Sequence, residues 1–270
     1  MFGFGPRGDG LTTTGPRSLQ QTTGPGTSVR VEVEPGTTPR LGSYDRVVVH
    51  IDGADARDLP LATMLPDPRP GTPKGQIRRL ELRATNVHLA SLRAREVNLL
   101  ADDVTFDLPT ALTRHELRVT RLGHQTLTVR FADGDLDDYA AEFFPELLAP
   151  HVTFEDGRFV MRAKLPLFVA AFPITIRGDL RVNMQQQILL RNPSIETGRV
   201  EFSGDVIAAL LSRLDPLVDM DELLQFSAPL DWQRAVTGTG WATIEGRLDT
   251  PDAAPAARSF NPRQHYDELF

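Results

Sequence analysis

Apolar and polar residues alternate along most of this chain, which is the pattern of β-strands with one buried face. In residues 174–184 every second position from Ile174 to Met184 is apolar except Gly178, and the positions between them are polar or charged. Residues 158–165 alternate in the same way. Further strands are expected at residues 29–33, 47–51, 79–84, 97–101, 104–108, 117–119, 127–131, 188–190 and 241–248, and around Trp232. Such one-sided strands are typical of antiparallel sheets with one solvated face.

Two local signals add detail to this strand pattern. The alternation changes phase at Asp102 and Asp103, which predicts a bulge that bends the strand there. The pair Asp156–Gly157 stands between two alternating runs, which predicts a hairpin turn.

Helical spacing occurs in two substantial segments. The apolar positions of the first are Leu136, Tyr139, Ala140, Phe143 and Leu147, and those of the second are Ile207, Leu210, Leu211 and Leu214. Both follow the three-or-four-residue spacing of an amphipathic helix. Ser203 is the expected N-cap of the second helix, Pro216 its stop, and residues 217–224 a further short helical turn.

Many one-sided strands and few helices predict an α+β fold: a strongly curved antiparallel β-sheet wrapped around two or three helices in a single domain. We expect this domain to span residues 28–249. Residues 1–27, rich in Gly, Pro and Thr, are expected to be a disordered segment, and residues 250–270 a mobile tail.

Composition excludes several classes of function. A formal net charge of −7 argues against a general nucleic-acid binder, which needs a basic face. The chain has no cysteine, so thiolate catalysis and Cys-ligated zinc are excluded. The six histidines are scattered singly, and no catalytic sequence motif is present. We therefore predict no enzyme activity, no cofactor and no metal site.

Two groups of expected strands are locally basic despite the acidic composition. One lies between residues 69 and 95, and the other between residues 158 and 201. A solvated sheet face with ion pairs between strands is the plain interpretation. The functional one is attraction to an anionic membrane, with Arg158, Arg162, Arg177 and Arg181 as contacts to lipid head groups.

The most apolar stretch is LPLFVAAFPITI, residues 165–176. It is too short to span a bilayer and contains Pro166 and Pro173. Because alternating strands flank it, residues 166–173 are expected to form a turn without a polar side chain. Turns usually lie at the surface and are polar. This one is expected to enter the membrane interface beside a lipid groove, to fill the core, or to contact another protein.

The order of these segments resembles the LmeA-like family of bacterial phospholipid-binding proteins. The resemblance rests on LDDYAAEFFPELL, VTFEDGRFVMRAKL, FPITIRGDLRV, ILLRNPSIETGRVEF, VIAALLSRLDPLVDMDEL and ATIEGRL, and covers roughly residues 44–248. It implies a non-enzymatic lipid binder of the cell envelope with an antiparallel sheet curved around helices. The export signal or membrane anchor usual in such proteins is not recognisable here.

We therefore predict a phospholipid-binding or lipid-carrier protein that holds acyl chains in an apolar groove between sheet and helices. The expected groove residues are Phe143, Leu147, Leu167, Phe168, Val169, Phe172, Leu211 and Leu214. The alternative is a structural or interaction module whose apolar face is closed by its own helices or by a partner subunit. Cytoplasmic location is expected if Met1 is the true start, and a periplasmic or envelope location if an export signal precedes it. The oligomeric state stays open.

Overall fold

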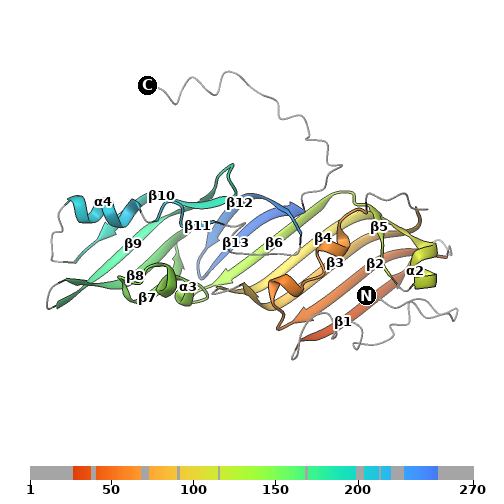
Figure 1. The fold of residues 1–270 in the computed structure, drawn as a ribbon, viewed down its shortest axis with the longest axis horizontal. Helices are drawn as coiled ribbons and strands as arrows, with labels where there is room; N and C mark the ends of the chain where they lie inside the picture. Colours follow the sequence, from red (N-terminus) through yellow and green to blue (C-terminus); the bar gives the residue numbers. More distant parts are fainter. Residues whose placement is uncertain are drawn as a thin grey trace, which may run out of the picture.

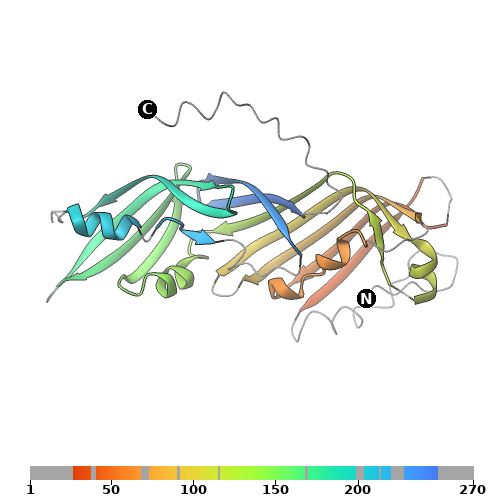
Figure 2. The same cartoon turned by 45° about the horizontal axis from the view of Figure 1, so that its top comes forward.

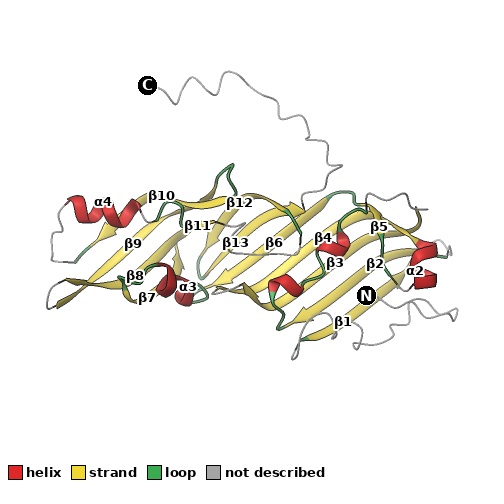
Figure 3. Ribbon diagram, in the orientation of Figure 1, coloured by secondary structure: helices red, strands yellow, loops and turns green. Residues whose placement is uncertain are grey.

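The structure is a computed structural model that describes residues 27–37, 41–67, 73–89, 92–114, 116–167, 170–198, 204–212, 214–219 and 228–248. The described part of the chain is mostly β-strand with few helices (Figure 3). The strands form two sheets that lie side by side along the long axis of the molecule (Figure 1). This confirms the prediction of a strand-rich protein with little helix.

The larger sheet has eight strands. Their order is β1 (Ser28–Pro35), β2 (Ser43–Asp52), β3 (Pro73–Leu89), β4 (Leu92–Asp107), β6 (Gln125–Ala132), β13 (Trp241–Leu248) and β12 (Leu230–Gly238), with the short β5 (Val119–Arg121) paired to β4. All neighbours are antiparallel except β2 and β3, which are parallel. The predicted antiparallel pairing is thus confirmed with one exception, whereas the expectation of a single sheet is wrong, because the strands form two sheets.

The smaller sheet has five strands and is antiparallel throughout. Their order is β11 (Val218–Asp219), β10 (Gln187–Glu196), β9 (Ala170–Val182), β8 (Arg158–Leu167) and β7 (Leu148–Glu155). The β7–β8 turn contains Asp156 and Gly157, both with positive φ, as the hairpin signal predicts. Asp156 has a φ of 50°, and aspartate is one of the residue types that tolerate this left-handed conformation.

Backbone hydrogen bonds join the two sheets at β7. The amide of Gly240, between β12 and β13, donates to the carbonyl of Phe154 at 2.7 Å. The amide of Gly134, after β6, donates to the carbonyl of Val152 at 2.9 Å. One cluster of buried apolar side chains includes residues of both sheets.

The connection between β2 and β3 covers the apolar face of the larger sheet. It contains two short 3-10 helices, η1 (Ala56–Asp58) and η2 (Ala62–Met64), which lie against this sheet in Figure 2. Leu59, Leu61 and Met64 are at most 1 % exposed. Because a parallel pair requires a crossover, the β2–β3 connection is placed to cover one face of the sheet.

The remaining helices are short: α2 (Leu108–Arg114), α3 (Asp137–Phe143) and α4 (Gly204–Ser212). The two predicted helices correspond to α3 and α4, whereas α2 was not predicted. The predicted helical turn at residues 217–224 is wrong at its start, because Val218 and Asp219 pair with β10 as strand β11. Ser203 and residues 220–224 lie outside the described residues.

The phase change predicted at Asp102 and Asp103 is present within the single strand β4. Val97, Leu99 and Ala101 are buried before it, and Val104 and Phe106 after it. Asp103 has a φ of 52°. At the same point β4 stops pairing with β6, and its later residues pair with β5. The sheet is therefore curled, while its wrapping around helices stays a prediction.

Candidate functional site

Strands β8 and β9 form a hairpin whose closed end extends beyond both neighbouring strands, β7 and β10. Strand β7 pairs with β8 only as far as Lys164, and β10 pairs with β9 only as far as Thr175. Strands β8 and β9 continue to pair up to Leu167 and Ala170. The hairpin end therefore projects from the sheet as a two-stranded ribbon, at the lower left of Figure 1.

The predicted turn over residues 166–173 is wrong, because most of these residues belong to the two strands. Pro166 pairs with Ala171, and Pro173 pairs with Lys164. Proline is tolerated in strands at sheet edges, where one side lacks a hydrogen-bonding neighbour. Both prolines lie at such positions, since β7 and β10 have already ended. Only Phe168 and Val169 remain between the strands, and they lie outside the described residues.

The apolar face of the small sheet continues onto this ribbon. Cross-strand pairing places Leu165 opposite Phe172, on the same face as the buried pair Met161 and Ile176. Leu165 is buried and Phe172 is half-buried. For Leu167 only the backbone is described. The ribbon therefore carries apolar residues from the core toward its projecting end.

Helix α3 and the start of β7 each carry one exposed apolar side chain. Phe143, at the end of α3, is 45 % exposed and stacks on Tyr139, with ring centroids 5.3 Å apart. Leu147 is buried. Leu148, which was not predicted as a site residue, is 47 % exposed and pairs with Lys164 of β8. Its position at the start of a strand gave no signal of this exposure.

Helix α4 contributes the last two predicted groove residues. Leu214, just after the helix, is buried in the core, and Leu211 packs against that core with partial exposure. The described side chains of the predicted groove thus differ in how far they are buried. Leu147 and Leu214 are core residues, Phe172 and Leu211 are partly exposed, and Phe143 is exposed.

Three of the four predicted head-group arginines form ion pairs on the polar face of the small sheet. Arg158 lies 3.4 Å from Asp179, Arg162 lies 2.7 Å from Glu155, and Arg177 pairs with Glu196. The hydrogen bond from Arg162 lowers the pKa of the Glu155 carboxyl. Arg181 has no ion-pair partner among the described residues and is exposed. The plain interpretation, ion pairs between strands, therefore accounts for three of the four.

A comparison with known protein families matches a part of the chain that includes the segments described above. A sequence model described as LmeA-like phospholipid-binding matches residues 67–239, more than half of the chain. The chain belongs to this family. The resemblance found in the sequence is thereby confirmed. A search of curated proteins and a search of solved structures each gave no match.

The segment of this LmeA-like protein that matches its family includes α3, the β8–β9 hairpin and α4. It leaves out β1, β2 and β13. Strand β13 nevertheless lies between β6 and β12 in the larger sheet. The structural unit is therefore longer than the family match.

Polar residues near α3 have structural partners. Asp137 accepts hydrogen bonds from the Val152 amide at 2.7 Å and pairs with the His151 ring at 2.8 Å. This carboxylate ties α3 to β7. Among the residues that the structure describes, no group of three or more His, Asp or Glu is arranged to hold a metal ion. Within the same residues, no helix has the length and apolarity to span a membrane.

Proposed function

We propose that this member of the phospholipid-binding family carries phospholipid without chemical change, and that the β8–β9 ribbon is its membrane contact. The observation that carries the proposal is the ribbon itself. It extends beyond both neighbouring strands, and its sequence from Leu165 to Pro173 has no polar side chain. An exposed apolar projection is unfavourable in water and suits a non-aqueous partner.

The acyl chains would lie along the apolar face of the small sheet, with α3 and α4 at its borders. Phe172 and Leu211 retain exposed surface, and Phe143 adds an exposed aromatic ring. Leu167, Phe168 and Val169 would complete the outer end of this groove. Burial of each CH₂ contributes about 0.8 kcal/mol, so a chain of ordinary length is held strongly once a groove exists.

Basic residues on the opposite face of the small sheet would favour approach to an anionic membrane. Each basic residue near such a surface contributes about 1 kcal/mol, less when it is already paired. Arg181 lacks an ion-pair partner in the described part of the chain, so we assign it the largest share. Arg158, Arg162 and Arg177 would contribute less.

The second candidate is a structural or interaction module whose apolar face is closed. The coverage of the larger sheet by Leu59, Leu61 and Met64 favours this interpretation for that sheet. It does not account for the projecting ribbon of the smaller sheet. The two candidates therefore differ in what they predict for the ribbon.

Organic extraction and native mass spectrometry of protein purified without detergent separate the two candidates. A carrier is expected to retain phospholipid and to pass it between vesicles. The paired substitutions Phe168→Asp and Phe172→Asp should abolish both. Leu41→Asp is a control for an added surface carboxylate, because Leu41 is 77 % exposed and lies just before β2 of the larger sheet. A wild-type protein that holds and transfers no lipid favours the closed module.

A further inference from the structure

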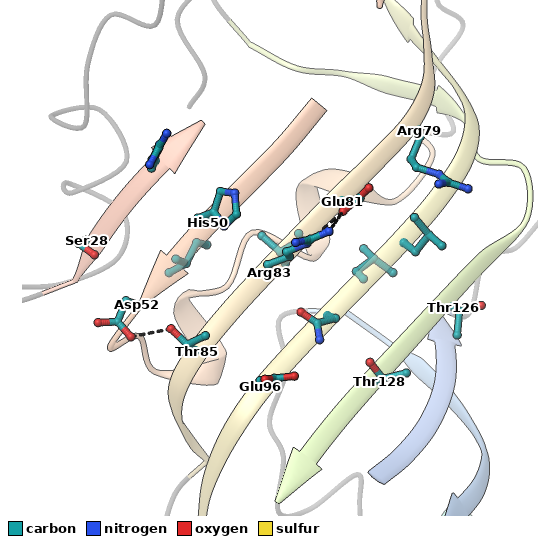
Figure 4. A pocket seen from close by; sticks show the side chains of 16 residues that line it. Ser28, His50, Asp52, Arg79, Glu81, Arg83, Thr85, Glu96, Thr126 and Thr128 are labelled. Carbon is teal, nitrogen blue, oxygen red and sulfur yellow. Dashed lines mark hydrogen bonds and ion pairs between the residues drawn. The ribbon is translucent and has the colours of Figure 1, made fainter. Parts of the chain in front are cut away.

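The polar face of the larger sheet contains a hollow of about 770 Å³, shown in Figure 4. Side chains from β1, β2, β3, β4 and β6 line it. Arg83, on its floor, stands between Leu82 and Ala84, which are both fully buried on the other face. The hollow therefore lies on the side of the sheet opposite to the apolar core.

Strand register sets five polar side chains in one row across this hollow. The row runs through successive cross-strand neighbours: Arg30, His50, Arg83, Asn98 and Thr128. Adjacent strands are about 4.8 Å apart, so neighbouring members of the row are within reach of one ligand. Each member has an N–H or O–H group, and none is a carboxylate. No pattern of residues along the chain indicates this row, because the parallel β2–β3 pairing creates it.

Two of the carboxylates that line the hollow already accept hydrogen bonds from protein donors. Glu81 accepts from Arg46 at 2.7 and 3.0 Å and from the Arg83 Nε at 3.0 Å. Asp52 accepts from Thr85 at 2.6 Å and from Asn86 at 2.8 Å. Figure 4 shows the Glu81–Arg83 and Asp52–Thr85 contacts at the floor and edge of the hollow.

Several donors in the row remain available. Within the described residues, the side chains of Asn98 and Thr128 form no hydrogen bond, and the Nη1 of Arg83 forms none. The other two members of the row are not counted as available, because Glu32 lies 3.1 Å from Arg30 and 3.7 Å from the buried Nε2 of His50. Glu96 also lines the hollow, one row away, and forms no ion pair or side-chain hydrogen bond within the described part of the chain. The unused capacity of the row is therefore for donation.

We propose that this hollow binds an organic phosphate, whose oxygens accept hydrogen bonds from Arg83, Asn98 and Thr128. Phosphate oxygens are acceptors, and guanidinium groups bind them with charge-assisted hydrogen bonds. The volume exceeds what inorganic phosphate needs and lies in the range of small-molecule sites. The ligand is a soluble phosphomonoester or the head group of a phospholipid. This site goes beyond the lipid-carrier function, because the acyl chains would bind the apolar face of the other, smaller sheet.

The test is a ³¹P NMR titration with two probes, glycerol 3-phosphate and monomeric dihexanoyl phosphatidylglycerol. Arg83→Gln is expected to weaken binding about tenfold or more, as loss of a charged hydrogen bond does. Asn98→Leu is expected to weaken it by a smaller factor without touching an ion pair. Arg57→Gln is the control for charge, because Arg57 is exposed, pairs with Asp55 and does not line the hollow.

The two probes distinguish the source of the phosphate. Saturable binding of glycerol 3-phosphate that depends on Arg83 assigns a soluble ligand. Binding of the phosphatidylglycerol alone, with the same dependence, assigns a head group. Absence of saturable binding for both probes, or equal affinity in wild type, Arg83→Gln and Asn98→Leu, overturns the proposal. The lipid-carrier function is read separately, from lipid retained by protein with the Phe168→Asp and Phe172→Asp substitutions.

Discussion

Leu165 and Phe172 face each other across the β8–β9 ladder, one position beyond the last residue of β8 that β7 reaches. Leu165 is 7 % exposed, whereas Phe172 is only half-buried. The pair marks where the apolar face of the small sheet leaves the core and enters the projecting ribbon. A substitution here therefore distinguishes packing from membrane contact.

Replacing Phe168 and Phe172 together by Asp is expected to leave the protein folded and to remove most of its lipid uptake. A carboxylate costs up to about 3 kcal/mol inside a bilayer. The melting temperature should stay within about 4 °C of wild type, the shift that roughly 1 kcal/mol produces in a domain of this size. Calorimetry and vesicle-to-vesicle transfer measure the two quantities. A large fall in melting temperature would instead identify the hairpin end as core.

Changing Arg158, Arg162, Arg177 and Arg181 to Gln is expected to weaken binding to anionic vesicles. Arg181→Gln alone should account for the largest part, since the other three are in ion pairs. Vesicle sedimentation should show the effect at about 0.01 M salt and its loss at about 1 M, where screening shortens the Debye length to about 3 Å.

The control for the arginine experiment replaces four arginines that form ion pairs elsewhere: Arg57, Arg78, Arg234 and Arg247. These changes remove the same formal charge from other surfaces. Equal binding to neutral and anionic vesicles, or an equal loss in the control, would contradict the assignment of the basic face.

Leu61→Ala is expected to destabilise the protein by about 3 kcal/mol, because Leu61 is fully buried beneath the larger sheet. Lipid uptake should not change, since the proposed groove belongs to the smaller sheet. Urea unfolding gives the stability, and organic extraction gives the lipid content. Loss of lipid in a variant that remains folded would move the groove to the larger sheet.

Strand positions were predictable because alternation directly reports which face of a strand is buried. The phase change at Asp103 was visible for the same reason, and the helices α3 and α4 have strong three-or-four-residue spacing. The hairpin end was not predictable. Alternation disappears where both faces of a strand are apolar. In addition, Pro166 and Pro173 indicate the end of a strand, although the structure places them inside strands, at positions where the neighbouring strands have already ended.

The pairing of strands that are distant in the sequence could also not be predicted from the pattern of residues. Nothing in the residues of β2 and β3 indicates parallel pairing, which the crossover through Leu61 and Met64 creates. The row from Arg30 to Thr128 depends on that pairing. The sequence therefore indicates that β3 is basic, but it does not indicate that these basic residues surround Glu81.

A chain limited to residues 67–239, the segment that matches the family, is expected not to fold. It lacks β13, which pairs with both β6 and β12, and it exposes the edge of β3 that β2 covers. Residues 28–249 should fold as one unit. Circular dichroism and cooperative urea unfolding of both chains check this. A cooperative transition in the shorter chain would show that the smaller sheet and the remaining strands suffice.

Glu81 is expected to make stability depend on pH in acid. Its hydrogen bonds with Arg46 and Arg83 hold the pKa of the Glu81 carboxyl down to about 2 in the folded protein, against an ordinary value of 4.5. A lowered folded pKa means that the stabilisation is present above pH 4.5 and is lost as the pH falls toward 2. Glu81→Gln should therefore lower the free energy of unfolding by on the order of 2 kcal/mol at pH 7, and the difference from wild type should shrink as the pH falls from 4.5 toward 2.

Urea unfolding between pH 7 and pH 2 measures this difference, with Glu155→Gln as an exposed ion-pair control of much smaller effect. A difference that stays constant down to pH 2 would show that Glu81 contributes through packing and not through its charge.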